Sequence, residues 1–181
     1  MRKVVAYELM SIDGVVESPD QFVLAWDDVM AENLFRVIGT QDDVLLGRGQ
    51  HDEWAAYWPT ATSDLEFAAF INGVPKHVAT SSALTIPWNA ASTIDGSVED
   101  FVADLKHGTG GDIGVHGSVT LLHSLLRARL VDELALVVSP VVVGAGRRLF
   151  EQGDGVQRLE LTGSVTSPSG ALLVGYRVHH D

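Results

Sequence analysis

The stretch GDIGVHGSVTLLHSLLRARLVDELALVVSPVVVGAGRRLF, residues 111–150, carries most of the information about the fold. An apolar run at 113–115 ends at Gly117 and Ser118, and a leucine-rich amphipathic segment follows directly. This pattern predicts a strand followed at once by a helix, and the unpaired backbone N–H groups of the first helical turn then face the same point in space. Because the helix dipole adds partial positive charge there, the turn suits a phosphate group.

The rest of the chain alternates between strand and helix patterns. We expect strands at 2–9, 44–46, 76–80, 113–115, 134–143, 157–166 and 170–178, and helices at 27–39, 50–57, 64–71, 97–107 and 119–129. The last two strands are joined by Ser-Pro-Ser-Gly at 167–170, which is typical of a hairpin turn. This order predicts an α/β fold of three layers, with a mostly parallel central sheet and an antiparallel C-terminal hairpin. No linker or repeat divides the sequence, so we expect a single domain over residues 1–181.

The composition limits the function classes. Hydrophobic residues make up 46% of the chain, and no apolar run approaches the roughly 18 residues that a membrane-spanning helix needs. The chain has no cysteine, which excludes disulfides and thiolate metal sites and fits a cytoplasmic protein. The histidines show no ligand spacing, so we expect no metal. The net charge of −12 argues against nucleic acid and membranes as partners.

The order of motifs in residues 111–150 closely resembles the C-terminal half of the dihydrofolate reductase superfamily. The resemblance is to the branch with the reductase domain of riboflavin biosynthesis (RibD C-terminal type), and family-like motifs extend from residue 4 to about residue 178. It implies a dihydrofolate-reductase-like fold with NADPH as the cofactor. It also implies that the turn at Gly117, Ser118 and Val119 receives the cofactor pyrophosphate, because glycine lets the backbone approach closely.

The segment LLGRGQHDEWAAYWP, residues 45–59, resembles the family's G-R-x-T-Y-E turn. In relatives, the arginine and the helix N-terminus hold phosphates of NADPH, often including the adenosine 2′-phosphate, which implies cofactor contacts for Gly47 and Arg48. The chain departs from the family at Gln50-His51-Asp52, where an amide replaces a hydroxyl and Asp52 adds negative charge. This departure leaves the preference between NADPH and NADH open.

Two further segments resemble parts of the family that contact the cofactor. In PKHVATSS, residues 75–82, the resemblance implies that Thr80 and Ser81 contact the adenosine phosphate and ribose, although hydroxyl residues also end strands as turn formers. In AYELMSIDGVVESP, residues 6–19, the family's loop runs beside the nicotinamide, which implies a cofactor contact for Asp13. The alternative for Asp13 is a plain tight turn.

The loop GAGRRLF, residues 144–150, matches the family's G-x-G-x-x-L-F loop. It is not a Rossmann fingerprint, because it opens no long helix and lacks the third glycine. Its Arg147 and Arg148 either serve an anionic substrate or are solvated side chains.

Two carboxylates are candidates for catalytic proton transfer. Glu8 lies inside an otherwise apolar strand, where burial would raise its pKa toward the range of a general acid. The alternative for Glu8 is a position on a solvated edge. Asp27 lies at the start of the first expected helix, and folate reductases carry their substrate-binding carboxylate on this helix. Acids in a first turn also simply stabilise the helix dipole.

These features together predict an NADPH-dependent reductase that transfers a hydride to a small heterocyclic substrate (pterin-, pyrimidine- or flavin-related) or to a carbonyl substrate. The alternative is a non-catalytic dimer of the same fold that binds NADP or another ligand. We also expect a homodimer, because strands 134–143 and 170–178 are apolar and an open edge strand is an aggregation hazard. Related reductases commonly pair through this region.

Overall fold

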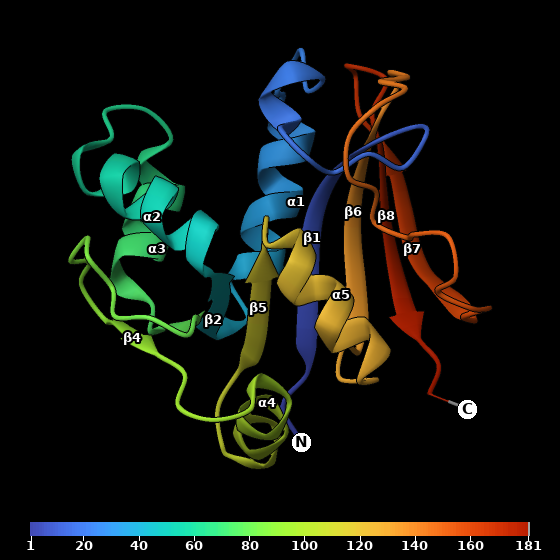
Figure 1. Ribbon diagram of the computed structural model, residues 1–181. Helices are drawn as coiled ribbons and strands as arrows, with labels where there is room; N and C mark the ends of the chain where they lie inside the picture. Colours follow the sequence, from blue (N-terminus) through green and yellow to red (C-terminus); the bar gives the residue numbers. More distant parts are fainter. Residues whose placement is uncertain (181) are drawn as a thin grey trace.

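The computed structural model describes residues 1–180, which are built around one eight-stranded sheet of order β4-β3-β2-β5-β1-β6-β8-β7 (Figure 1). Its strands are β1 (Val4–Ser11), β2 (Gln41–Gly47), β3 (Lys76–Ala79), β4 (Ala91–Thr93), β5 (Asp112–His116), β6 (Glu133–Ser139), β7 (Leu159–Thr166) and β8 (Leu172–Val178). The strands from β4 to β6 pair in parallel, whereas β8 is antiparallel to β6 and β7 is antiparallel to β8. The structure therefore confirms a mostly parallel sheet with an antiparallel C-terminal hairpin.

Helices cover both faces of this sheet and make three layers (Figure 1). They are α1 (Asp28–Ile38), α2 (Arg48–Tyr57), α3 (Leu65–Gly73), α4 (Val98–His107) and α5 (Val119–Arg127), with short 3-10 turns at Pro19–Gln21 and Trp58–Thr60. Alternate residues of β1 face opposite layers: Tyr7 packs in a cluster with Met30 of α1, and Ala6 packs in a cluster with Leu122 of α5. No helix within residues 1–180 is long and apolar enough to cross a membrane.

The strand-to-helix connections follow local sequence. Helix α4 begins after Ser97, whose hydroxyl oxygen accepts a hydrogen bond of 3.2 Å from the Asp100 backbone N–H, as expected for an N-cap. Strand β5 ends at His116 and is followed by Gly117, which has a φ of +62°, a conformation that glycine adopts without strain. Helix α5 follows directly and points its N-terminus toward the carboxyl end of the sheet.

The edges of the sheet differ from the expectation. The strand expected at 134–143 ends at Ser139, before Pro140, and both β6 and β8 are interior strands with a neighbour on each side. The edges are β4 and β7 instead, so the argument that β6 and β8 leave an open edge is wrong. Strand β4 was not expected, because its three residues are partly or fully exposed and show no apolar pattern.

Candidate functional site

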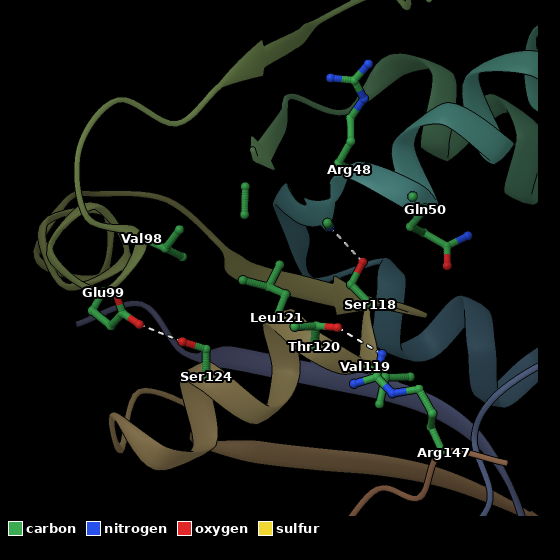
Figure 2. Close-up of a pocket in the computed structure, with 13 residues that line it drawn as sticks. Arg48, Gln50, Val98, Glu99, Ser118, Val119, Thr120, Leu121, Ser124 and Arg147 are labelled. Carbon is green, nitrogen blue, oxygen red and sulfur yellow. Dashed lines mark hydrogen bonds between the residues drawn. The ribbon is translucent and has the colours of Figure 1, made fainter. Parts of the chain in front are cut away.

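A cavity of about 450 Å³ lies outside the carboxyl ends of β2, β3 and β5, between α4 and α5 (Figure 2). Such crevices beyond strand ends are the usual ligand sites of open α/β sheets. One part of the wall contains Gly47, Arg48, Ser118 and Val119, four of the predicted cofactor residues. The structure thus brings together residues 47–48 and 118–119, which are about seventy positions apart in the sequence.

The N-termini of α2 and α5 meet at this cavity. The Ser118 hydroxyl oxygen accepts a hydrogen bond of 2.8 Å from the Gly47 backbone N–H, which joins the two helix starts. Among the described residues, neither helix start is capped by its own N-cap residue, because Gly47 has no side chain and the Ser118 hydroxyl makes no capping hydrogen bond to α5. Backbone donors of both first turns therefore face the same space, and both helix dipoles favour an anion there.

Gly117 keeps this turn open for close approach. A Cβ atom at this position would lie 2.5 Å from the Gln50 side-chain amide, so no larger residue fits without displacing it. With its nitrogen toward the turn, the Gln50 amide donates a hydrogen bond of 2.9 Å to the Gly117 carbonyl oxygen. The amide that replaces the family's hydroxyl at position 50 therefore supports the turn at Gly117.

Arg48 lies at the cavity wall, but its guanidinium points away from Ser118 (Figure 2). Its Nε donates to Asp52 Oδ2 at 2.7 Å, and its Nη1 donates to the Ala83 carbonyl oxygen at 2.8 Å. A third bond of 3.1 Å runs from Nη2 to Thr85 Oγ1. The hydrogen bond from Arg48 holds the pKa of Asp52 below its usual value. Arg48 therefore links α2 to the loop after β3.

Four predicted cofactor residues do not line this cavity: Gly117, Thr80, Ser81 and Asp13. Thr80 Oγ1 accepts a hydrogen bond of 3.2 Å from the Ser82 backbone N–H, as in a local turn, and Ser81 is exposed. Asp13 accepts hydrogen bonds from the backbone N–H groups of Val143 and Gly144 at 3.0 and 2.9 Å. These bonds, the Val143 bond foremost, lower the pKa of Asp13. The cofactor contacts of these residues stay predictions, as do those of the four residues in the wall.

The loop that Asp13 holds brings Arg147 to the cavity, although the sequence predicts no cofactor contact for this residue. Arg147 Nη1 donates to Thr120 Oγ1 at 2.9 Å, in the first turn of α5 (Figure 2). Its carbonyl oxygen accepts from the Val16 backbone N–H at 2.9 Å, so two distant loops fix its position. Of the two arginines in the G-x-G-x-x-L-F loop, Arg147 thus adds positive charge at a helix N-terminus.

Glu8 is a buried carboxyl group in the middle of β1, with 2% of its surface exposed. Burial raises its pKa to about 8, although a hydrogen bond from the Gly117 backbone N–H acts in the opposite direction. Within residues 1–180, its Oε1 has no hydrogen-bond partner. The alternative of a solvated edge position is therefore wrong, and Glu8 is a group that holds a proton at neutral pH.

Asp27 has a structural role at the start of α1. Its Oδ1 accepts from the Met30 backbone N–H at 3.0 Å, and its Oδ2 accepts from the Ser169 backbone N–H at 3.0 Å and from the Ser167 hydroxyl. These bonds, the Ser167 bond foremost, lower the pKa of Asp27 to about 2. The carboxylate holds no proton at neutral pH, so a role of Asp27 as proton donor does not agree with the structure.

Comparisons with known proteins agree with this architecture. The sequence model of the RibD C-terminal domain family matches residues 2–173, so the chain belongs to this family. The uncharacterized protein YyaP of Bacillus subtilis (strain 168) is 26% identical over 182 residues, which cover 97% of this chain and 94% of YyaP.

Solved structures with the same fold include a dihydrofolate reductase and a pyrimidine reductase-like protein. A pyrimidine reductase-like protein from Corynebacterium diphtheriae matches with a TM-score of 0.68 and 14% identity, over 99% of this chain and 93% of that one. Dihydrofolate reductase from Enterococcus faecalis, complexed with NADP(H) and RAB-propyl, matches with a TM-score of 0.63 and 16% identity, over 99% and 97% of the two chains. These matches confirm the dihydrofolate-reductase-like fold.

Proposed function

We propose that the protein is an NADPH-dependent reductase that transfers a hydride to a small heterocyclic substrate (pterin-, pyrimidine- or flavin-related) or to a carbonyl substrate. The observation that carries this proposal is the position of Gly117. Its turn leads into the α5 N-terminus at the cavity, and its backbone N–H donates to the buried carboxyl group of Glu8. A turn suited to a phosphate and a buried carboxyl group therefore lie next to each other.

The cavity fits the phosphate part of NADPH in its chemistry. Backbone N–H groups at the starts of α2 and α5 supply donors, and the Arg147 guanidinium supplies the charge. Beyond them, the side chains of Ala79, Val98 and Leu121 give the cavity an apolar wall against which a flat base can lie. Membership in the RibD C-terminal domain family and the NADP(H) named for the Enterococcus reductase support the same cofactor.

Bound reduced nicotinamide would supply the hydride, and the protein would supply orientation and a proton. Glu8 is protonated at neutral pH because its pKa is about 8, and its Oε1 has no partner within residues 1–180. The apolar neighbours of β1 keep water away from this group. A protonated carboxyl group in such surroundings can donate to a substrate atom that gains electron density.

The second candidate function is a non-catalytic dimer that binds NADP or another ligand. It is favoured by the pairing of Arg48 with Asp52 at 2.7 Å, because this ion pair reduces the positive charge available to a phosphate. Stopped-flow loss of NADPH absorbance across a panel of reducible heterocycles and carbonyl compounds separates the two functions. The reductase proposal predicts turnover on at least one compound, whereas binding of NADPH without turnover on any of them supports the binding protein.

We further propose that the protein forms a homodimer through β7. This strand is an edge of the sheet, and nearly all of its residues are exposed. Leu161 and Val165 on β7 are 55% and 54% exposed. An edge strand with exposed apolar side chains is a surface that proteins usually cover.

A further inference from the structure

One carboxylate lies in the wall of the cavity, on α4. Glu99 Oε1 accepts a hydrogen bond of 2.6 Å from Ser124 Oγ on α5 (Figure 2). Its Oε2 accepts one of 3.1 Å from Ser97 Oγ. These bonds, the Ser124 bond foremost, hold the pKa of Glu99 below its usual value. Glu99 is therefore a fixed negative charge in a cavity whose other end is suited to anions.

The strand order indicates which half of a dinucleotide lies beside Glu99. Gly117 follows β5, and β5 has β1 on one side and β2 and then β3 on the other. Glu8, the candidate proton donor, is on β1, so the reacting nicotinamide belongs on that side. The adenosine half then lies on the side of β2 and β3, where Ala79 and Val98 line the cavity next to Glu99.

The charges at this adenosine end favour a further phosphate only weakly. Arg48 is paired with Asp52 at 2.7 Å, so its positive charge is partly offset. Arg147 contacts Thr120 at the start of α5, where the pyrophosphate is expected. Glu99 forms no salt bridge within residues 1–180, so its charge is stabilised only by two serine hydroxyls and by the N-terminus of α4, in whose first turn it lies.

We propose that Glu99 sets the cofactor preference: its carboxylate repels the 2′-phosphate of NADPH and accepts hydrogen bonds from the ribose hydroxyls of NADH, so the protein uses both nucleotides. The inference rests on the proposed function, because it requires a dinucleotide at this cavity. Its physical basis is general. Like charges at close range repel strongly where water is scarce, and a carboxylate at an adenosine ribose is a known means of selecting NADH.

Calorimetric titration of the protein with NADPH and with NADH tests this proposal. In Glu99→Gln, the side-chain oxygen still accepts from Ser124, but the charge is gone. We expect NADPH to bind at least about fivefold more tightly than to the wild type at low salt, with NADH affinity changed less than twofold. Asp100→Asn is the matched control, since Asp100 is exposed on the same turn of α4 and the charge change is equal.

The outcomes separate this inference from the proposed function. If both nucleotides bind the wild type and Glu99→Gln changes their affinities by the same factor, the role of Glu99 is refuted and the reductase proposal stands. If Asp100→Asn reproduces the gain for NADPH, the effect is one of net charge, and the role of Glu99 is again refuted. If neither nucleotide binds the wild type, both proposals fail.

Discussion

The hydroxyl oxygen of Ser118 accepts a hydrogen bond of 2.8 Å from the backbone N–H of Gly47, and this bond joins the first residues of α5 to those of α2. The two helix N-termini at the cavity are therefore held in one relative position before any ligand binds. Preorganised donors need no rearrangement when an anion arrives, which is why a single hydroxyl can influence binding by both helices.

We expect Ser118→Ala to weaken NADPH binding about threefold to tenfold, because the Gly47 N–H loses its partner and the two helix starts lose their link. The midpoint of thermal unfolding should fall only slightly. Calorimetry and a thermal scan measure the two effects. Ser92→Ala, at an exposed position on β4, is the control and should change neither. Unchanged affinity in Ser118→Ala would show that the link does not organise the site.

Arg48→Ala should weaken the binding of NADPH by about 1.5–3 kcal/mol and the binding of NADH by less, because only NADPH carries the extra phosphate that a guanidinium can bind. To contact this phosphate, the Arg48 guanidinium must leave its hydrogen bond to Asp52. The negative charge of Glu99 in the same cavity keeps the preference for NADPH over NADH small. Parallel titrations with both nucleotides give the comparison. Arg158→Ala removes an equal charge at an exposed position as the control. Equal weakening of the two nucleotides would leave Arg48 at most a pyrophosphate contact.

Turnover should depend on the protonated form of Glu8, so kcat should fall as the pH rises through about 8. Glu8→Gln should lower turnover sharply and remove this pH dependence, while NADPH affinity stays close to that of the wild type. Glu66→Gln, at an exposed position on α3, is the control. A variant Glu8→Gln that keeps full turnover would mean that the substrate proton comes from water or that none is needed.

The raised pKa of Glu8 also leads to a prediction for the stability of the fold. Its pKa is raised from 4.5 to about 8 in the folded protein, so the folded state binds more protons than the unfolded state between these values. The free energy of unfolding should therefore decrease as the pH rises from about 4.5 to about 8, by up to a few kcal/mol, and then level off. Urea unfolding at pH 6 and pH 9 should show this decrease in the wild type and lose it in Glu8→Gln.

The sequence allowed the local parts of the site to be predicted, because they depend on neighbouring residues. The turn at Gly117 and the helix after it follow from a glycine at the end of an apolar run. Arg147 was not assigned to the site, because its position depends on the pairing of its loop with Val16, about 130 residues away. The bond between Asp27 and Ser167 spans a similar separation, and no local pattern indicates it.

The wild-type protein should have the mass of a dimer in light scattering at micromolar concentration. Leu161→Glu should shift it to the monomer, because it places a charge among the exposed apolar residues of β7. Leu65→Glu changes an equally apolar side chain that is 64% exposed on α3, which packs against β2 in the other half of the sheet, and it should remain dimeric. A monomer mass for the wild type would contradict the homodimer.

Hydrogen exchange of the backbone amides, with and without saturating NADPH, tests most directly whether a nicotinamide dinucleotide binds at the joined starts of α2 and α5. Exchange should slow at residues 47–50 and 117–121 together, because the phosphates accept from these N–H groups. The loop around Arg147 should become protected at the same nucleotide concentration. Slower exchange confined to other segments, or none at a nucleotide concentration that saturates binding, would contradict the account.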